Sequence, residues 1–188
     1  MRFALLIAAV TTIAAAIYYS VTLSWAFASY GPLEVWAGIA RSAFYLGLAA
    51  FACSFAVRCG DTPECQIGVI ILLGLLIDPL LHLLFEHRVA QVDPTHFIVD
   101  GATFVAFVIV TLRAARVWTA CLSAFQLLSL GAHAAKALNV GIHPVVYVAM
   151  AVMWSYGMLI LLIIATRRHR LPHARNVIPA SWRSSLRR

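Results

Sequence analysis

Charged residues are scarce in this chain. Asp, Glu, Lys and Arg make up 11% of its 188 residues, whereas 63% are hydrophobic. A water-soluble domain carries roughly 25% charged residues, because its surface has to face water. No polar stretch between the apolar runs is long enough to form a second folded unit. The composition therefore excludes a soluble catalytic domain and predicts an all-α membrane protein, since a bilayer solvates apolar side chains directly.

Motifs of metal and cofactor chemistry are missing as well. The cysteines form no CxxC pair and no Cys/His zinc spacing, and the CxxCH signature of attached haem is absent. We therefore predict no catalytic residue and no metal site, and an enzyme ranks below a non-enzymatic role. The four cysteines are Cys53, Cys59, Cys65 and Cys121.

What the sequence does contain is a series of long apolar runs. A helix needs roughly 20 apolar residues to cross the hydrocarbon core of a bilayer. Turn residues separate the runs, and Asp93-Pro94 is expected to supply an N-cap and a first helical residue. The predicted fold is a polytopic bundle of about six transmembrane helices over 1–166, followed by a basic cytoplasmic tail, 167–188. The six predicted spans are 3–28, 35–57, 66–86, 95–112, 117–138 and 144–166.

The basic residues indicate how the bundle sits in the membrane, because cytoplasmic loops carry an excess of Lys and Arg. With both termini in the cytoplasm, eleven arginines lie on the inner side and Arg88 alone lies in an outer loop. We therefore expect both termini to lie on the cytoplasmic side of the membrane. Contact with the lipid bilayer then explains the net charge of +7, and no nucleic-acid partner is needed. The inner arginines are Arg2, Arg58, Arg113, Arg116, Arg167, Arg168, Arg170, Arg175, Arg183, Arg187 and Arg188.

Ionisable side chains inside the spans are the most informative residues, because burying them in lipid is costly. All of them fall in the outer half of the predicted bundle or near its midplane. Asp78, His82 and Glu86 are four residues apart and share one helix face, and His96 and Asp100 have the same spacing. The predicted polar cluster consists of Arg41, Asp78, His82, Glu86, Asp100, Gln126, His133 and Lys136.

The predicted span 117–138 carries a polar stripe, whose members recur at steps of three or four residues. This spacing places them on one face of a helix, which should point at protein or at a water-filled crevice. Leu127, Leu130 and Leu138 should lie more toward lipid or apolar packing. The stripe consists of Thr119, Ser123, Gln126, Ser129, His133 and Lys136.

Two interpretations of the polar cluster stay open. It can be a paired network that holds helices together, or an externally open crevice that binds an ion, a proton or a small ligand. A continuous pore is disfavoured, because the inner halves of the helices offer no matching polar lining. No cofactor is predicted, and haem b held by His82 and His133 is a minor alternative. We expect Asp78 and Asp100 each to have a cationic or hydrogen-bonding partner, with Arg41, His82, His133 and Lys136 as the candidates.

A set of residues in the last part of the chain carries a family resemblance. The set is Asp100, Arg116, Trp118, Phe125 to Leu128, His133, Ile142 to Pro144, Tyr147 and Trp154 to Tyr156. With these residues, the stretch 100–166 resembles small alphaproteobacterial multi-pass inner-membrane proteins of unknown function. The resemblance implies a bacterial inner-membrane protein and assigns no catalytic residue.

The function predicted from the sequence is that of an accessory or structural subunit of a larger membrane complex, with other membrane subunits as partners. The short loops and the lack of a soluble catalytic domain favour this role. The alternative is a small transporter, a channel-like protein or a ligand-binding protein that uses the polar cluster in the outer half of the bundle.

Overall fold

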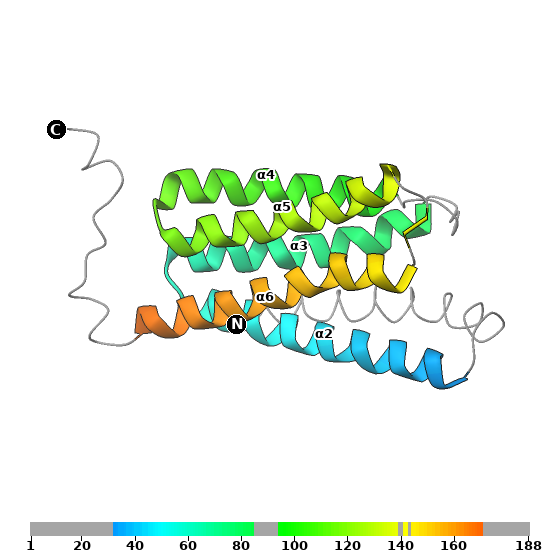
Figure 1. Ribbon diagram of the computed structural model, residues 1–188. Coiled ribbons are helices and arrows are strands. Elements are labelled where there is room, and N and C mark those ends of the chain that lie inside the picture. The colour runs from blue at the N-terminus through cyan, green and yellow to red at the C-terminus, as the bar shows by residue number, and fades with distance from the viewer. Residues whose placement is uncertain (1–31, 85–93, 139–140, 143, 171–188) are drawn as a thin grey trace.

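The computed structural model describes residues 32–84, 94–138, 141–142 and 144–170, which Figure 1 draws as coloured ribbon. In this part of the chain all regular structure is α-helical, which confirms the predicted all-α class. The five described helices are α2 (Pro32–Cys59), α3 (Thr62–Leu84), α4 (Pro94–Ala114), α5 (Val117–Leu138) and α6 (Pro144–Arg170).

The five helices form a closed ring. Each one packs against the next along the chain, and α6 closes the ring by packing against α2 (Figure 1). Consecutive helices run in opposite directions, because the connections between them are short. With an odd number of helices, α2 and α6 run in the same direction where they meet.

Four of the predicted spans are helices long and apolar enough to cross a membrane. These segments are Gly38–Cys59, Thr62–Leu81, Thr95–Ala114 and Val117–Leu138. The predicted span 144–166 is also helical, as part of the 27-residue α6. The predicted span 3–28 lies outside the described residues, so the count of six stays a prediction.

Helix α3 begins four residues before the predicted start of its span, and a cap explains the difference. Asp61 precedes the helix, and its backbone N–H donates to Glu64 Oε2 at 3.1 Å. A carboxylate three residues after the cap that bonds back to the cap N–H is the geometry of a capping box. Helix α4 begins at Pro94, as predicted, while the expected cap Asp93 lies outside the described residues.

Helices α2 and α3 pack closely in one half of the ring, near the turn that joins them. A Cβ atom on Gly68 would lie 3.3 Å from the Ala56 side chain and 3.4 Å from the Cys53 carbonyl oxygen, so α2 and α3 approach closely there. We call this half the closed half; its core is formed by Ala49, Ala52, Cys53, Ala56, Ile67, Phe107, Val110, Leu122, Met158, Leu159 and Leu162.

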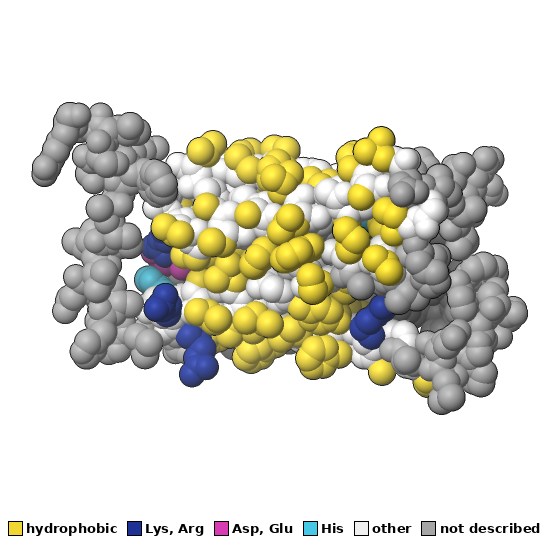
Figure 2. Space-filling model, viewed as in Figure 1, with side chains coloured by type: hydrophobic (Ala, Val, Ile, Leu, Met, Phe, Trp, Pro, Cys, Tyr) yellow, Lys and Arg dark blue, Asp and Glu magenta, His cyan; other side chains and the backbone are white. Residues whose placement is uncertain are grey.

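The outside of the ring is apolar. Large hydrophobic side chains such as Phe44, Leu112 and Leu127 are exposed on different helices. Figure 2 shows hydrophobic side chains over the middle of one face, with Lys and Arg toward its two ends. This arrangement fits a helical bundle surrounded by lipid, with its cations at the level of the head groups.

Candidate functional site: a polar cavity inside the helix ring

The half of the ring opposite the closed half contains a cavity of about 560 Å³, to which all five described helices contribute. We call it the cavity half. It includes the start of α2, α4 and α6 and the end of α3 and α5. The polar lining residues are Arg41, Ser42, Tyr45, Asp78, His96, Asp100, Thr103, Gln126, Ser129, His133, Tyr147, Ser155 and Tyr156.

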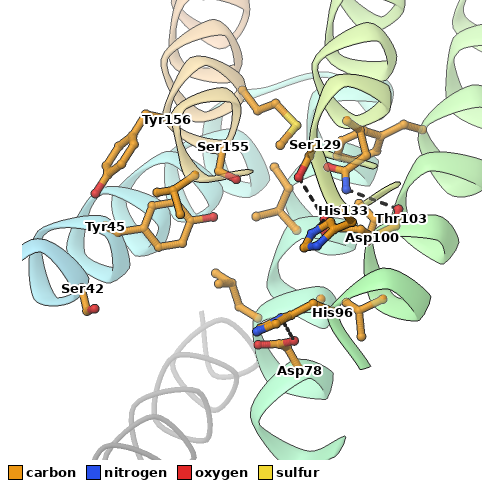
Figure 3. Close-up of a pocket in the computed structure, with 18 of the residues that line it drawn as sticks. Ser42, Tyr45, Asp78, His96, Asp100, Thr103, Ser129, His133, Ser155 and Tyr156 are labelled. Atoms are coloured by element: carbon orange, nitrogen blue, oxygen red, sulfur yellow. Dashed lines mark hydrogen bonds and ion pairs between the residues drawn. The ribbon is translucent and has the colours of Figure 1, made fainter. Parts of the chain in front are cut away.

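Asp100 on α4 is the centre of the polar wall. Its Oδ2 atom accepts a hydrogen bond from Ser129 Oγ at 2.9 Å and lies 3.1 Å from His133 Nε2 (Figure 3). The other ring nitrogen of His133, Nδ1, lies 2.6 Å from the Tyr147 hydroxyl on α6. Gln126 adds a bond from its Nε2 to the Asp100 carbonyl oxygen at 3.3 Å. Three helices are therefore joined through one carboxylate and one imidazole.

These contacts confirm the predicted orientation of the polar stripe on α5 from Thr119 to His133, whereas Lys136 and Leu130 are both half-buried and do not show the predicted contrast. The members of the stripe from Thr119 to His133 are buried, and those that bond across the interface reach α4 or α6. By contrast, Leu127 and Leu138 are exposed, at 54% and 90%. A period of three to four residues was enough to identify this face, because it is set by the geometry of a single helix.

A second aspartate–histidine pair lines the same cavity. Asp78 Oδ1 on α3 lies 2.7 Å from His96 Nδ1 on α4 (Figure 3). The His96 ring also stacks on the His133 ring, with the ring centroids 6.3 Å apart. Two carboxylates and two imidazoles therefore meet on one wall. The spacing of four residues places His96 on the same helix face as Asp100, and it does not predict the pairing of His96 with Asp78.

The opposite wall carries hydroxyl groups on aromatic rings. Tyr45 of α2 and Tyr156 of α6 meet edge to face, with ring centroids 5.3 Å apart, and Figure 3 shows Ser42 and Ser155 on the same side. None of these residues was predicted. Aromatic residues in an apolar chain are expected in the core or at the lipid interface, so their types carry no signal for a site.

The remaining predicted cluster residues are spread around this cavity. Arg41 is exposed and borders it, and its carbonyl oxygen accepts a 3.4 Å bond from Tyr156. Lys136 is not a lining residue, and its Nζ donates to the Ile142 carbonyl oxygen at 2.7 Å. His82 lies on α3, but its side chain is not among those described, and Glu86 lies outside the described residues.

The cavity offers little to a metal or haem. In the described part of the chain, no three His, Cys, Asp or Glu side chains are placed to hold a metal ion. Both ring nitrogens of His133 already have partners. An axial bond from His133 to haem iron would therefore have to break one of these contacts.

A separate polar cluster at the other end of the ring was not predicted as a site. Arg116 donates from Nη1 to Glu64 Oε1 at 2.8 Å and from Nη2 to Asp61 Oδ2 at 2.9 Å. Glu64 is 1% exposed. We call these three residues the Arg116 clamp, since they tie the start of α3 to the turn between α4 and α5. From the sequence, Arg116 is predicted only to be a basic residue on the cytoplasmic side.

The lining of the cavity defines its chemistry. Its polar groups stand among apolar side chains such as Ile71, Val99 and Phe107, and the cavity does not continue into the closed half, where Phe107 and Met158 belong to the packed core. It can hold a small molecule with an apolar body and a few polar groups, and its imidazoles can exchange protons.

Comparisons of this chain with protein-family models, curated proteins and solved structures find no match. The geometry of the cavity therefore carries the functional argument.

Proposed function

We propose that this chain is a membrane protein that binds a small ligand in the cavity inside its helix ring. The observation that carries the proposal is that two aspartate–histidine pairs and three tyrosine side chains border one cavity of about 560 Å³. Ligand sites of small molecules are concave, mostly apolar and supplied with a few convergent polar groups. The cavity has these properties.

The partial exposure of the two carboxylates indicates that the cavity is a binding site and not only a gap between packed helices. A polar network that only holds helices together gains from being closed off from open space. Here Asp78 and Asp100 remain 30% and 28% exposed at their side chains, while His133 behind Asp100 is 6% exposed. The carboxylates stand at the cavity surface, and their partners hold them in place.

Binding fits the geometry better than conduction. The cavity occupies one half of the ring, and a packed core that includes Phe107, Leu122 and Leu159 fills the other half. A conducting pathway would need polar groups or water along its whole length. We further propose that the chain lies in a bacterial inner membrane with both termini in the cytoplasm, so that the cavity half is the outer half, as the arginine distribution suggests.

A cavity-filling substitution tests the proposal. Gly74 on α3 lines the cavity, and a Cβ atom there would be in ordinary contact, 3.6 Å from Thr103 Oγ1. Gly47 on α2 is exposed, and a Cβ atom there would meet no other atom within 4 Å, so Gly47→Leu is the matched control. The full chain is purified in lipid nanodiscs without detergent, and small molecules are released by denaturation and identified by mass spectrometry.

We expect a small molecule to be retained by the wild type and by Gly47→Leu and to be lost from Gly74→Leu. A compound retained equally by all three proteins would not be bound in the cavity and would contradict the proposal. Co-purification of a stoichiometric second membrane protein, with no small molecule in any sample, would instead favour the accessory-subunit role predicted from the sequence.

A further inference from the structure

We propose that the outer surface of the helix ring holds one anionic phospholipid in a groove between α3 and α4, with an acyl chain along the groove and the phosphate at Arg113. The groove lies outside the cavity, so this inference is independent of the proposed ligand site. It follows from the lining of the groove, from the charge at its end and from the excess of cations at that end of the ring.

The groove is formed by two neighbouring helices and has a volume of about 380 Å³. Helix α4 lines it with Ala106, Ile109 and Val110, and α3 lines it with Val69 and Ile70. Val110 is buried at its floor and Ile109 is exposed at its rim, so the groove opens to the outside of the ring. None of these five side chains borders the cavity, which makes the groove a separate site.

The shape of the groove suits a hydrocarbon chain. On α4, positions 106, 109, 110 and 113 recur at helical spacing and form one stripe. With a rise of 1.5 Å per residue, the stripe from Ala106 to Arg113 is about 10 Å long. An acyl chain that lies along it gains van der Waals contacts with both helices, which an unfilled groove would forfeit. In a bilayer, lipid chains are the molecules that surround this apolar face.

Arg113 supplies the charge at one end of the groove. It is exposed in the last turn of α4, and the exposed Gln66 lines the same end from the start of α3. Among the described residues no carboxylate pairs with Arg113, whereas Arg116 is already held by Asp61 and Glu64. The Arg113 guanidinium and the Gln66 amide can therefore both donate to phosphate oxygens.

The end of the ring at which Arg113 lies carries more cations than acids. The two acids of the Arg116 clamp are the only carboxylates among the described residues there, and both bond to Arg116. Basic side chains at a membrane surface attract lipids of negative charge. An anionic head group is therefore favoured over a zwitterionic one, whose choline would stand among arginines. The other exposed arginines at this end are Arg58, Arg167 and Arg168.

Topology alone also explains arginines at the ends of membrane helices, because their stems lie along apolar surface while their charges reach the head groups. That explanation applies equally to Arg113 and to Arg58, which is exposed in the last turn of α2. Arg113 lines the groove and Arg58 does not. The two arginines are therefore a matched pair that separates a lipid site from a general surface charge.

The test uses the full chain, freed of lipid in mild detergent and titrated with lipid while bound copies are counted by native mass spectrometry. The probes are dioleoyl phosphatidylglycerol, dioleoyl phosphatidylcholine with the same chains, and glycerol 3-phosphate without chains. We expect the first phosphatidylglycerol to bind at least about five-fold more tightly than phosphatidylcholine. Glycerol 3-phosphate should not bind at these concentrations. Equal binding of the two lipids, or comparable binding of glycerol 3-phosphate, would overturn the inference.

Charge variants locate the phosphate. Arg113→Gln should weaken the binding of the first phosphatidylglycerol by about ten-fold, because charge-assisted hydrogen bonds to the phosphate are lost. Arg58→Gln changes the net charge by the same amount and should weaken it by less than about two-fold. Equal losses in the two variants would assign the binding to the overall charge of this end and would contradict a site at Arg113.

A groove-filling variant locates the chain. Ala106→Phe places a ring in the groove, whereas Ala102→Phe places the same ring on an exposed position of α4 one turn earlier, outside the groove. We expect Ala106→Phe to lower the affinity for phosphatidylglycerol by at least about five-fold and Ala102→Phe to leave it within about two-fold. Thermal unfolding checks that both variants are folded, and the arginine pair decides alone if Ala106→Phe is not. Unchanged affinity in a folded Ala106→Phe protein would overturn the inference.

Discussion

At the scale of single residues, buried polar groups of this protein are satisfied through a few shared acceptors. Asp100 contacts Ser129 and His133 through one carboxylate oxygen, and the other ring nitrogen of His133 contacts the Tyr147 hydroxyl. In an apolar surrounding, an unsatisfied polar group costs far more than a hydrogen bond gains, so each member of such a chain depends on the others. The network therefore positions Asp100 at the cavity surface.

The bond between Tyr147 and His133 provides a stability test. Tyr147→Phe removes the hydroxyl that lies 2.6 Å from His133 Nδ1, and we expect the free energy of unfolding to fall by about 1 kcal/mol. Tyr156→Phe is the control, because Tyr156 also lies on α6 at the cavity but makes only a 3.4 Å bond to the Arg41 carbonyl oxygen. Chemical unfolding in mild detergent measures both, and equal losses would mean that the His133 contact adds nothing specific.

At the scale of elements, the beginning of α3 combines a helix cap with an ion pair. Glu64 bonds back to the Asp61 N–H and also to Arg116, 52 residues further along the chain. The same carboxylate therefore caps one helix and ties it to the turn between α4 and α5. Ala115, which has a positive φ of 51°, lies in that turn next to Arg116. The left-handed conformation there reverses the chain sharply between the two helices.

Removal of Arg116 should be strongly destabilising. Arg116→Ala leaves the Glu64 carboxylate buried without its cation, and breaking a buried pair in this way costs about 3 kcal/mol. Arg113→Ala, which removes an exposed arginine from the last turn of α4, should change stability by less than about 0.5 kcal/mol. Thermal unfolding of both variants in the same detergent distinguishes them, and a small effect of Arg116→Ala would show that water reaches Glu64 readily.

Acid should weaken the Arg116 clamp. The backbone N–H of Thr62 and, with it, Arg116 hold the pKa of the Asp61 carboxyl below its ordinary value of 3.8, against the opposing effect of burial. A lowered pKa in the folded state stabilises the protein above pH 3.8, and this contribution is lost as the pH falls through the folded-state value. The stability difference between wild type and Asp61→Asn should therefore be constant near neutral pH and shrink below about pH 4. A stability difference that grows as the pH falls would contradict the lowered pKa of Asp61.

At the scale of the whole molecule, the ring has two unlike halves. The core of the closed half consists of small and apolar residues, with Glu64 buried beside it, and the cavity half holds the two aspartate–histidine pairs. Because α2 to α6 alternate in direction, each helix crosses from one half to the other. One end of the ring therefore carries the Arg116 clamp, and the cavity lies toward the other end.

Cysteine labelling tests which end of the helix ring faces the cytoplasm. Cys59 and Cys65 lie next to the turn between α2 and α3, in the closed half, and both are partly exposed. With both termini in the cytoplasm, a membrane-impermeant maleimide should leave these two thiols unlabelled in intact cells and label them in inverted vesicles. Labelling in intact cells only would reverse the orientation and would place the cavity on the cytoplasmic side.

Local sequence features were sufficient to predict most of the helices and the polar face of α5. The start of α4 at Pro94 and the bounds of α5 at Val117 and Leu138 match the prediction, because apolar runs and turn residues act over a few positions. The pairing of Asp78 with His96 and of Arg116 with Glu64 could not be predicted in the same way. Each pair joins two elements, and its formation depends on how far each helix is rotated and at what depth it lies.

Hydropathy and helical period were enough to predict that this chain forms long apolar helices and that α5 presents a polar face. These properties belong to single segments, so they can be read without knowing how the segments pack. The packing of α6 against α2, the tyrosines opposite the carboxylates and the cavity between them emerge only in the folded bundle. Closure of the ring selects those contacts, because it sets the rotation of five helices at once and so brings together side chains from distant parts of the chain.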